Sequence, residues 1–232
     1  MFTYSRSPYK PAEKLTMRPN TMDAEIWRDV AERNEYRLPP RFRSDDVILD
    51  IGAHIGAFSW LALTHGAGMV HAFEAHPENY PILKNNVSKF GNRIRTHNVA
   101  VWRSDRTGDY LHFLPLKYNT GGTCPLFGKG MPVKTVQFDE IISRVARNSR
   151  IRMVKIDAEG SEYGILLTSN QLEVIDEMVG EIHVKEPFSP HCLIKGIKEY
   201  NSFTISDCLK RRGFQVKMDH PGGRLTHFWA KR

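Results

Sequence analysis

A short apolar segment that ends in a glycine turn constrains the fold of this chain most. Residues 46–51 form an apolar run, which is typical of a buried strand. Gly52 and Gly56 bound the next five residues, and residues 57–64 have the pattern of a helix. Glycines at such a turn let the backbone approach a ligand closely. The segment therefore predicts a strand, turn and helix with a ligand site at the strand's carboxyl end.

Strand and helix patterns alternate through the rest of the chain. Alternation of this kind predicts a doubly covered, mostly parallel sheet, so the expected fold class is α/β and Rossmann-like. The expected strands cover 69–74, 94–101, 110–113, 152–157 and 179–183, with a closing antiparallel pair at 214–217 and 225–230. Three further helices are expected: one that begins at His76, one over 138–145 and one over 204–210.

The length of 232 residues favours one domain with a modest extension. We expect residues 1–45 to form an N-terminal extension and residues 46–232 to form the main domain. The extension contains one helix pattern, capped by Asn20 or Thr21 and carrying an apolar face that includes Trp27.

The chain is basic, with a formal net charge of +7, and residues 188–232 contribute nine Lys and Arg against three Asp and Glu. A solvated basic surface and a surface that attracts nucleic acid both remain open. An apolar fraction of 41% argues against disorder, and we see no apolar run long enough to cross a membrane. Three scattered cysteines, Cys124, Cys192 and Cys208, favour neither a disulfide framework nor a zinc site, so we expect a cytoplasmic location.

Two acidic residues beside the glycine turn favour one kind of cofactor. Glu74 ends the next strand 24 residues after Asp50, where a carboxylate can accept both hydroxyl hydrogen bonds of a ribose. The turn lacks the G-x-G-x-x-G pattern of dinucleotide sites, and Asp50 would repel a diphosphate. A cofactor with an ammonium and a sulfonium group, S-adenosylmethionine, fits better than a nicotinamide dinucleotide. A turn required only for packing is the alternative.

Three motifs resemble the FkbM family of class I methyltransferases: residues 47–59, residues 71–77 and residues 154–162. The lead-in at 17–23 and 34–36 is also similar, so the resemblance runs from about residue 18 to residue 183. It implies a seven-stranded, mostly parallel sheet, S-adenosylmethionine as methyl donor with S-adenosylhomocysteine as product, and transfer to an oxygen of a sugar, polyketide or related metabolite. Ala75 departs from the family's usual proline. Residues 119–134 and the basic C-terminus match nothing in the family, and we expect substrate choice to depend on them.

The motifs and the strand ends give one set of expected cofactor contacts. Backbone contacts to adenine are expected after the strand at 94–101, and Tyr36 is expected to close over the cofactor. The set comprises Tyr36, Asp50, Gly52, Ala53, His54, Gly56, Glu74, Ala75, Ala100, Val101 and Asp157.

The expected catalytic residues follow the fourth and fifth core strands. Asp157 and His183 end neighbouring strands, so we expect them to be the acid–base and orienting groups, with Glu159 assisting. A helix-capping Asp157 and a core His183 remain alternatives. Glu181 shares the strand face of His183, and Lys155 shares that of Asp157. No metal is predicted, although Asp157, Glu159 or Glu181 offers the oxygen ligands that magnesium takes.

The leading functional hypothesis is O-methylation of a hydroxyl on a small molecule, sugar or natural product, with a small-molecule or glycan acceptor as partner. An RNA methyltransferase and a non-catalytic binding protein with this fold are the alternatives. The sequence offers no sign of a membrane partner.

Overall fold

The computed structural model describes residues 15–108, 110–114, 118, 120, 130–146, 150–184 and 192–232. Residues 1–14 of the expected extension lie outside these ranges, as do Cys124 and most of the 119–134 stretch. No helix in the described residues is long and apolar enough to cross a membrane.

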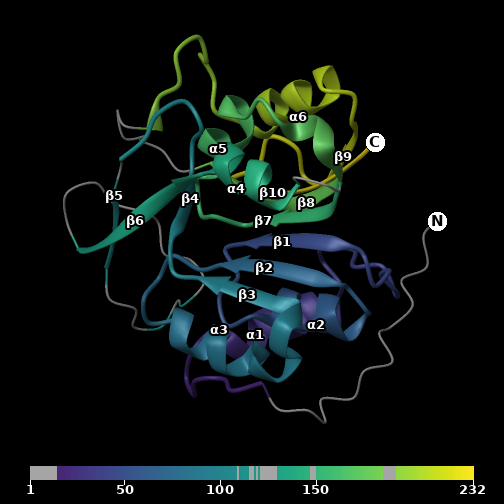
Figure 1. Cartoon of the computed structure of the whole chain (residues 1–232). Coiled ribbons are helices and arrows are strands. Elements are labelled where there is room, and N and C mark those ends of the chain that lie inside the picture. The colour runs from purple at the N-terminus through teal and green to yellow at the C-terminus, as the bar shows by residue number, and fades with distance from the viewer. Residues whose placement is uncertain are drawn as a thin grey trace.

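A seven-stranded sheet forms the centre of the molecule (Figure 1). All its strand pairs are parallel except the two made by β10, which runs antiparallel to β8 and β9. This arrangement confirms the predicted Rossmann-like class I methyltransferase fold. In spatial order, the strands are β3 (Ile94–His97), β2 (Met69–Phe73), β1 (Val47–Ile51), β7 (Ile151–Ile156), β8 (Ile175–His183), β10 (Leu225–Lys231) and β9 (Gln215–Met218).

Helices cover both faces of the sheet, as predicted, because successive side chains of each strand point to opposite faces. Ile48 packs into one apolar core, which includes Trp27, whereas Leu49 packs into a second core with Phe138. In Figure 1 the helices of the first core lie below the sheet and those of the second lie above it. The first group is α1 (Asp23–Ala31), α2 (Ala57–Thr64) and α3 (Tyr80–Val87), with the 3-10 helix η1 (Ser88–Arg93). The second is α4 (Phe138–Val145), α5 (Glu162–Thr168) and α6 (Ser202–Arg211), with the 3-10 helix η2 (Leu172–Val174).

The prediction of one strand over 94–101 is wrong. The chain leaves the main sheet at Asn98, whose side-chain amide donates to the backbone carbonyls of Glu74 and Ala75 at 2.8 and 3.1 Å. The following strand joins a second, three-stranded sheet in the order β4 (Ala100–Trp102), β6 (Met131–Gln137) and β5 (Tyr110–Phe113). The strand β6 was not predicted from the sequence.

The described part of the N-terminal extension packs into the first core of the main domain. The Trp27 and Trp60 rings meet edge to face with centroids 5.6 Å apart. The predicted helix is present and begins at Asp23, whose backbone N–H donates to the Thr21 hydroxyl at 3.3 Å. The buried Asp23 carboxylate accepts from the Arg18 guanidinium at 2.8 Å. The Trp27–Trp60 contact holds the extension against α2, the helix that follows the glycine turn, whereas the bonds of Asp23 to Thr21 and Arg18 lie within the extension.

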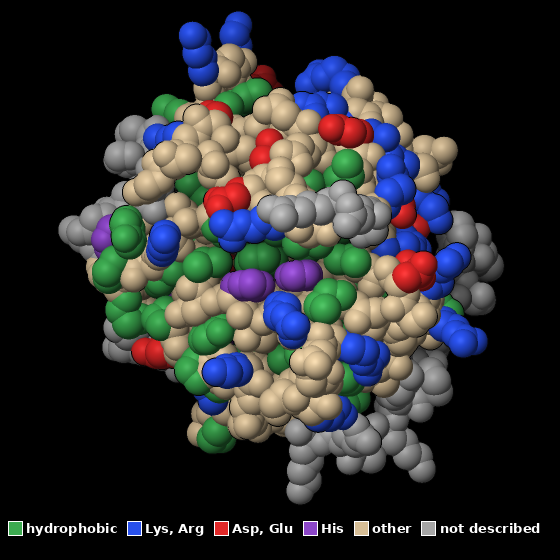
Figure 2. Space-filling model, in the orientation of Figure 1, with side chains coloured by type: hydrophobic (Ala, Val, Ile, Leu, Met, Phe, Trp, Pro, Cys, Tyr) green, Lys and Arg blue, Asp and Glu red, His purple; other side chains and the backbone are tan. Residues whose placement is uncertain are grey.

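Charged side chains are interspersed on the face drawn in Figure 2. Lys and Arg side chains are spread over this face, with Asp and Glu side chains between them. The Lys and Arg side chains are densest along the right-hand edge of this view.

Gly52 is required where β1 meets β7. Its φ angle is +75°, and a Cβ atom built on it would lie 1.7 Å from the backbone oxygen of Asp157. Any side chain would therefore combine an unfavourable backbone conformation with a clash against the neighbouring strand end.

We predict that Gly52→Ala lowers the free energy of unfolding by more than about 3 kcal/mol, because the conformational cost and the clash add. Urea unfolding followed by circular dichroism measures the change. Gly196→Ala is the matched control, since Gly196 has a φ of +85° and open space around it. The control should cost about 1–2 kcal/mol. Equal losses in the two variants would contradict the predicted clash.

Candidate active site

A cavity of about 450 Å³ lies beyond the carboxyl ends of β1, β2, β7 and β8. Ile51 pairs with Ile156 in the parallel register, so Gly52 and Asp157 follow side by side. The chain order of strands reverses direction between β1 and β7, and such switch points are where open α/β sheets bind ligands. The cavity is therefore at the place where the fold predicts a ligand.

Most of the predicted cofactor residues line this cavity. Asp50 and Gly56 are the exceptions, because neither belongs to the cavity wall. Gly56 is instead the N-cap of α2, with a φ of +92°, and a Cβ atom built on it would lie 2.8 Å from the Leu83 side chain. The predicted residues that do line the cavity are Tyr36, Gly52, Ala53, His54, Glu74, Ala75, Ala100, Val101 and Asp157.

The expectation that Asp50 contacts the cofactor directly is not supported by its position. Its carboxylate is fully buried, accepts from the Ser59 hydroxyl at 2.6 Å and lies 3.5 Å from the Lys155 ammonium. Lys155 donates to the Gly52 carbonyl at 2.6 Å. Burial lowers the pKa of Lys155, but the charges of Asp50 and Asp157 outweigh burial and raise it. Asp50 thus stabilises the charged Lys155, which in turn fixes the glycine turn through the Gly52 carbonyl.

Glu74 follows β2 and is fixed by the backbone around it. One carboxylate oxygen accepts from the His54 backbone N–H at 2.7 Å, and the other accepts from the His76 backbone N–H at 2.8 Å. The Asn79 side-chain amide adds a third donor at 3.3 Å. Burial raises the pKa of Glu74 even against these bonds. The carboxylate is therefore held rigidly at the cavity wall.

His54 lies within the glycine turn and is held by residues of the extension. Its Nε2 atom is 3.4 Å from Asp23 of the extension and 3.1 Å from the hydroxyl of Thr120, which donates to the same Asp23 carboxylate at 2.8 Å. Burial lowers the pKa of His54 to about 4, so the ring is neutral at pH 7. A neutral ring at this wall adds no positive charge against a cationic cofactor.

Asp157 carries one oxygen that no described residue satisfies. Its Oδ2 atom accepts from the Tyr36 hydroxyl at 3.0 Å, whereas Oδ1 is buried without a hydrogen-bond donor among the described residues. Burial and the nearby Glu181 raise the pKa of Asp157 to about 7. A carboxylate with this pKa and a vacant acceptor position is well suited to take a proton near neutral pH.

His183 lies among carboxylates at the end of β8. Its Nδ1 atom is 3.2 Å from Glu162, and its Nε2 atom is 3.3 Å from Glu181 and 3.7 Å from Glu159. Burial alone would lower the pKa of His183, but these acids outweigh burial and raise it to about 11. The ring is therefore a cation that orients the carboxylates. The acid–base part of the prediction consequently fits Asp157 better than His183.

Glu35 and His227 also lie at this end of the site, and neither was predicted from the sequence. Glu35 lines the cavity from the turn after α1, beside the predicted Tyr36. His227 pairs with Glu181 in the register of β10 against β8. The only signal for Glu35 was its place in the lead-in motif, and His227 became visible only once the strand register was known.

The sheet order, its single antiparallel strand and the cavity at the switch point define a methyltransferase fold of class I. Residues 50–216 match the family model of the methyltransferase FkbM domain, and the chain belongs to that family. It is accordingly an S-adenosylmethionine-dependent methyltransferase.

Solved structures with a similar chain path share little sequence with this protein. The precorrin-6y C5,15-methyltransferase of Geobacter metallireducens is 12% identical, with 99% of each chain covered and a TM-score of 0.49. The precorrin 8w decarboxylase of Methanobacterium thermoautotrophicum is 13% identical, with 97% of each chain covered and a TM-score of 0.48. TrmK of M. capricolum, in complex with S-adenosylhomocysteine, is 12% identical, with 86% of this chain and 66% of that chain covered and a TM-score of 0.44. No curated protein matches the sequence significantly.

We predict that Asp157 titrates near pH 7 and that Tyr36→Phe raises its pKa further, by about one unit. The Tyr36 hydroxyl donates to the carboxylate, and losing a hydrogen bond to the charged form favours the protonated form. Carboxyl ¹³C NMR on protein labelled at Asp measures the titration. Tyr80→Phe is the control, because the Tyr80 hydroxyl bonds to Thr96 instead. A midpoint near pH 4 in the parent protein would refute the prediction.

Proposed function

We propose that this methyltransferase transfers a methyl group to a hydroxyl oxygen of a small molecule, sugar or natural product. The observation that carries the proposal is Asp157, whose Oδ1 atom lacks a donor among the described residues at the cavity wall. A hydroxyl acceptor must lose a proton during methyl transfer, and a positioned carboxylate can take it. The Tyr36 hydroxyl keeps the other oxygen in place.

The cavity wall supports a definite placement of the cofactor. Glu74 would accept the ribose hydroxyls, and the backbone at Ala100 and Val101 would contact the adenine. The turn at Ala53 and His54 would hold the remainder, and Tyr36 would close the cavity from the extension. These residues all line the same cavity, which supports their joint role.

The proposed mechanism is an in-line displacement. S-adenosylmethionine, when bound, supplies a methyl group on a positively charged sulfur. Asp157 orients the acceptor hydroxyl and takes its proton as the oxygen–carbon bond forms and the carbon–sulfur bond breaks. The products are the methyl ether and S-adenosylhomocysteine, with the proton on Asp157. His183 keeps Glu159 and Glu181 oriented and does not take the proton.

The charge at the acceptor end favours an acceptor without phosphates. Glu159 and Glu181 line the cavity, and their carboxylates would repel a nucleic-acid backbone. Glu35 adds little charge at pH 7, because burial and the nearby Glu181 raise its pKa to about 8. The RNA alternative is supported by the basic composition, with its net charge of +7. The cytoplasmic location remains a prediction from the cysteines.

Transfer of labelled methyl groups tests the proposal directly. The full chain is incubated with methyl-labelled S-adenosylmethionine and, separately, with hydroxylated sugars and metabolites or with tRNA. We expect alkali-stable label in a small hydroxylated product. Label in tRNA with none in the small molecules would favour the RNA alternative, and cofactor binding without transfer to any acceptor would favour the non-catalytic one.

With an acceptor in hand, Asp157→Asn should lower kcat by about 10²–10⁴-fold, the range that a general base contributes. In the parent enzyme, kcat should rise with pH and level off above about 7, because the carboxylate is the active form and burial raises the pKa of Asp157 to about 7. Asp207→Asn, on the exposed side of α6, is the control and should leave kcat unchanged. A flat pH profile or a fully active Asp157→Asn variant would exclude Asp157 as the base.

Glu74→Ala should weaken binding of S-adenosylhomocysteine by about 10–100-fold, the range expected for losing hydrogen bonds to a charged group. Isothermal titration measures the dissociation constant. Glu78→Ala is the matched control, since Glu78 is an exposed acid in the same loop. Unchanged binding in a folded Glu74→Ala variant would remove the ribose role from Glu74 while leaving the family assignment intact.

A further inference from the structure

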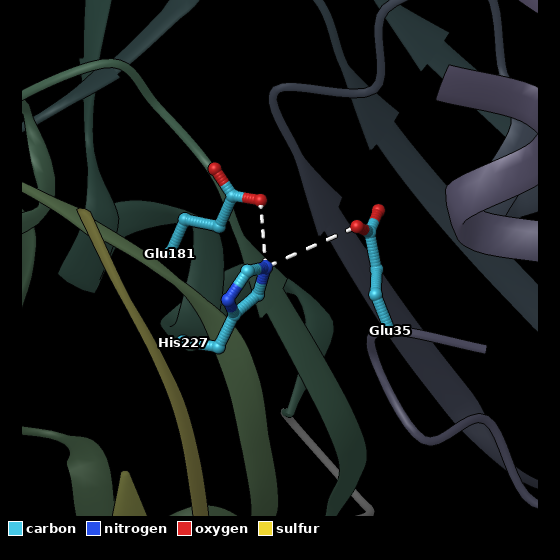
Figure 3. A group of neighbouring side chains, drawn as sticks. All are labelled: Glu35, Glu181 and His227. Carbon is cyan, nitrogen blue, oxygen red and sulfur yellow. Dashed lines mark ion pairs between the residues drawn. The ribbon is translucent and has the colours of Figure 1, made fainter. Parts of the chain in front are cut away.

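Three side chains from distant parts of the sequence converge beside the cavity (Figure 3). Glu35 comes from the turn after α1, Glu181 from β8 and His227 from β10. The antiparallel register places His227 directly opposite Glu181. The turn at Glu35 is fixed as well, because the Glu35 backbone N–H donates to the Asp29 carbonyl at 3.1 Å.

The donor atoms of this group have the spacing of metal ligands. His227 Nε2 lies 3.0 Å from Glu181 Oε1 and 3.9 Å from Glu35 Oε2. A tetrahedral ion with ligand distances of about 2.1 Å holds its donor atoms about 3.4 Å apart, between these two values. All three donor atoms lie within 4.8 Å of one another.

The His227 ring is oriented toward the gap between the two acids. In Figure 3 its Nε2 atom points into the space between the Glu181 and Glu35 carboxylates. This atom is ion-paired with Glu181 Oε1 at 3.0 Å, and an ion in the gap would replace that pair. An ion in the gap would satisfy the nitrogen and both carboxylates together.

Asp219 supports the opposite side of the same ring. Its Oδ2 atom lies 3.3 Å from His227 Nδ1, and its Oδ1 atom accepts from the His227 backbone N–H at 2.8 Å. A carboxylate on the second nitrogen is the common support of metal-binding histidines, because it fixes the ring and leaves the first nitrogen for the metal.

We propose that Glu35, Glu181 and His227 bind one divalent transition-metal ion, with Zn²⁺ as the best match to one imidazole and two carboxylates. Glu35 and Glu181 also line the cavity, so the ion's remaining coordination position faces the space where an acceptor would lie. The site stands independently of the proposed O-methylation, because it rests on these side chains alone.

A neighbouring group provides the competing location. Asp157, Glu159 and His183 also have donor atoms close together. His183 Nε2 lies 4.0 Å from Asp157 and 3.7 Å from Glu159, so neither carboxylate comes as close to the ring as Glu181 comes to His227, at 3.0 Å. Glu181 faces both groups, with Oε1 toward His227 and Oε2 toward His183. Variants must therefore distinguish the two locations.

The test is direct titration of the tag-free, chelator-treated chain with Zn²⁺, followed by Co²⁺ as a spectroscopic substitute. We expect one Zn²⁺ per chain and the visible absorption of tetrahedral Co²⁺. Glu35→Gln and His227→Gln should each weaken Zn²⁺ binding by about 100-fold or more. Asp219→Asn, which keeps all three ligands, should weaken it by about 10–100-fold.

Two control variants locate the ion. Glu32→Gln changes an exposed acid three residues from Glu35 and should leave Zn²⁺ affinity unchanged, as should Glu159→Gln in the neighbouring group. Circular dichroism and the melting temperature confirm that each variant folds. The proposal is overturned if the parent chain binds no Zn²⁺, or if affinity falls in Glu159→Gln and persists in folded Glu35→Gln and Asp219→Asn.

Discussion

The close approach of β1 and β7 at their carboxyl ends is the constraint on which the site depends. The Gly52 backbone lies against the carbonyl of Asp157, with no room for a side chain between them. Lys155 bonds to the Gly52 carbonyl and is balanced by the buried Asp50. This one packed contact therefore fixes both the glycine turn on the cofactor side and the Asp157 carboxylate on the acceptor side.

Charge is distributed unevenly in this basic protein, because acidic side chains gather at one end of the cavity. The net charge is +7, yet the acceptor end of the cavity is lined by Glu35, Asp157, Glu159 and Glu181. His183, Lys155 and His227 each lie within 4 Å of one of these acids. Carboxylates held together in a partly buried site favour cationic or uncharged ligands, which fits both a sulfonium cofactor and a metal ion.

Much of the fold could be predicted from local patterns. The helices α2 and α4 occur at the predicted residues, because their apolar spacing and flanking turns are local signals. The split at Asn98 and the strand β6 could not be predicted, because both depend on a second sheet. The Asn98 side chain bonds to the backbone carbonyls of Glu74 and Ala75, and no neighbouring residue in the sequence indicates that contact.

The sequence by itself determined the family, the strand–turn–helix unit at Gly52 and the candidates Glu74 and Asp157, since each belongs to a contiguous motif. Only the tertiary structure decided that Asp50 faces Ser59 and Lys155 rather than the cavity, and that Glu35 meets Glu181 and His227. The physical reason is that a motif fixes the local backbone. The direction and partners of a buried charge depend on strand register and on segments that are distant along the chain.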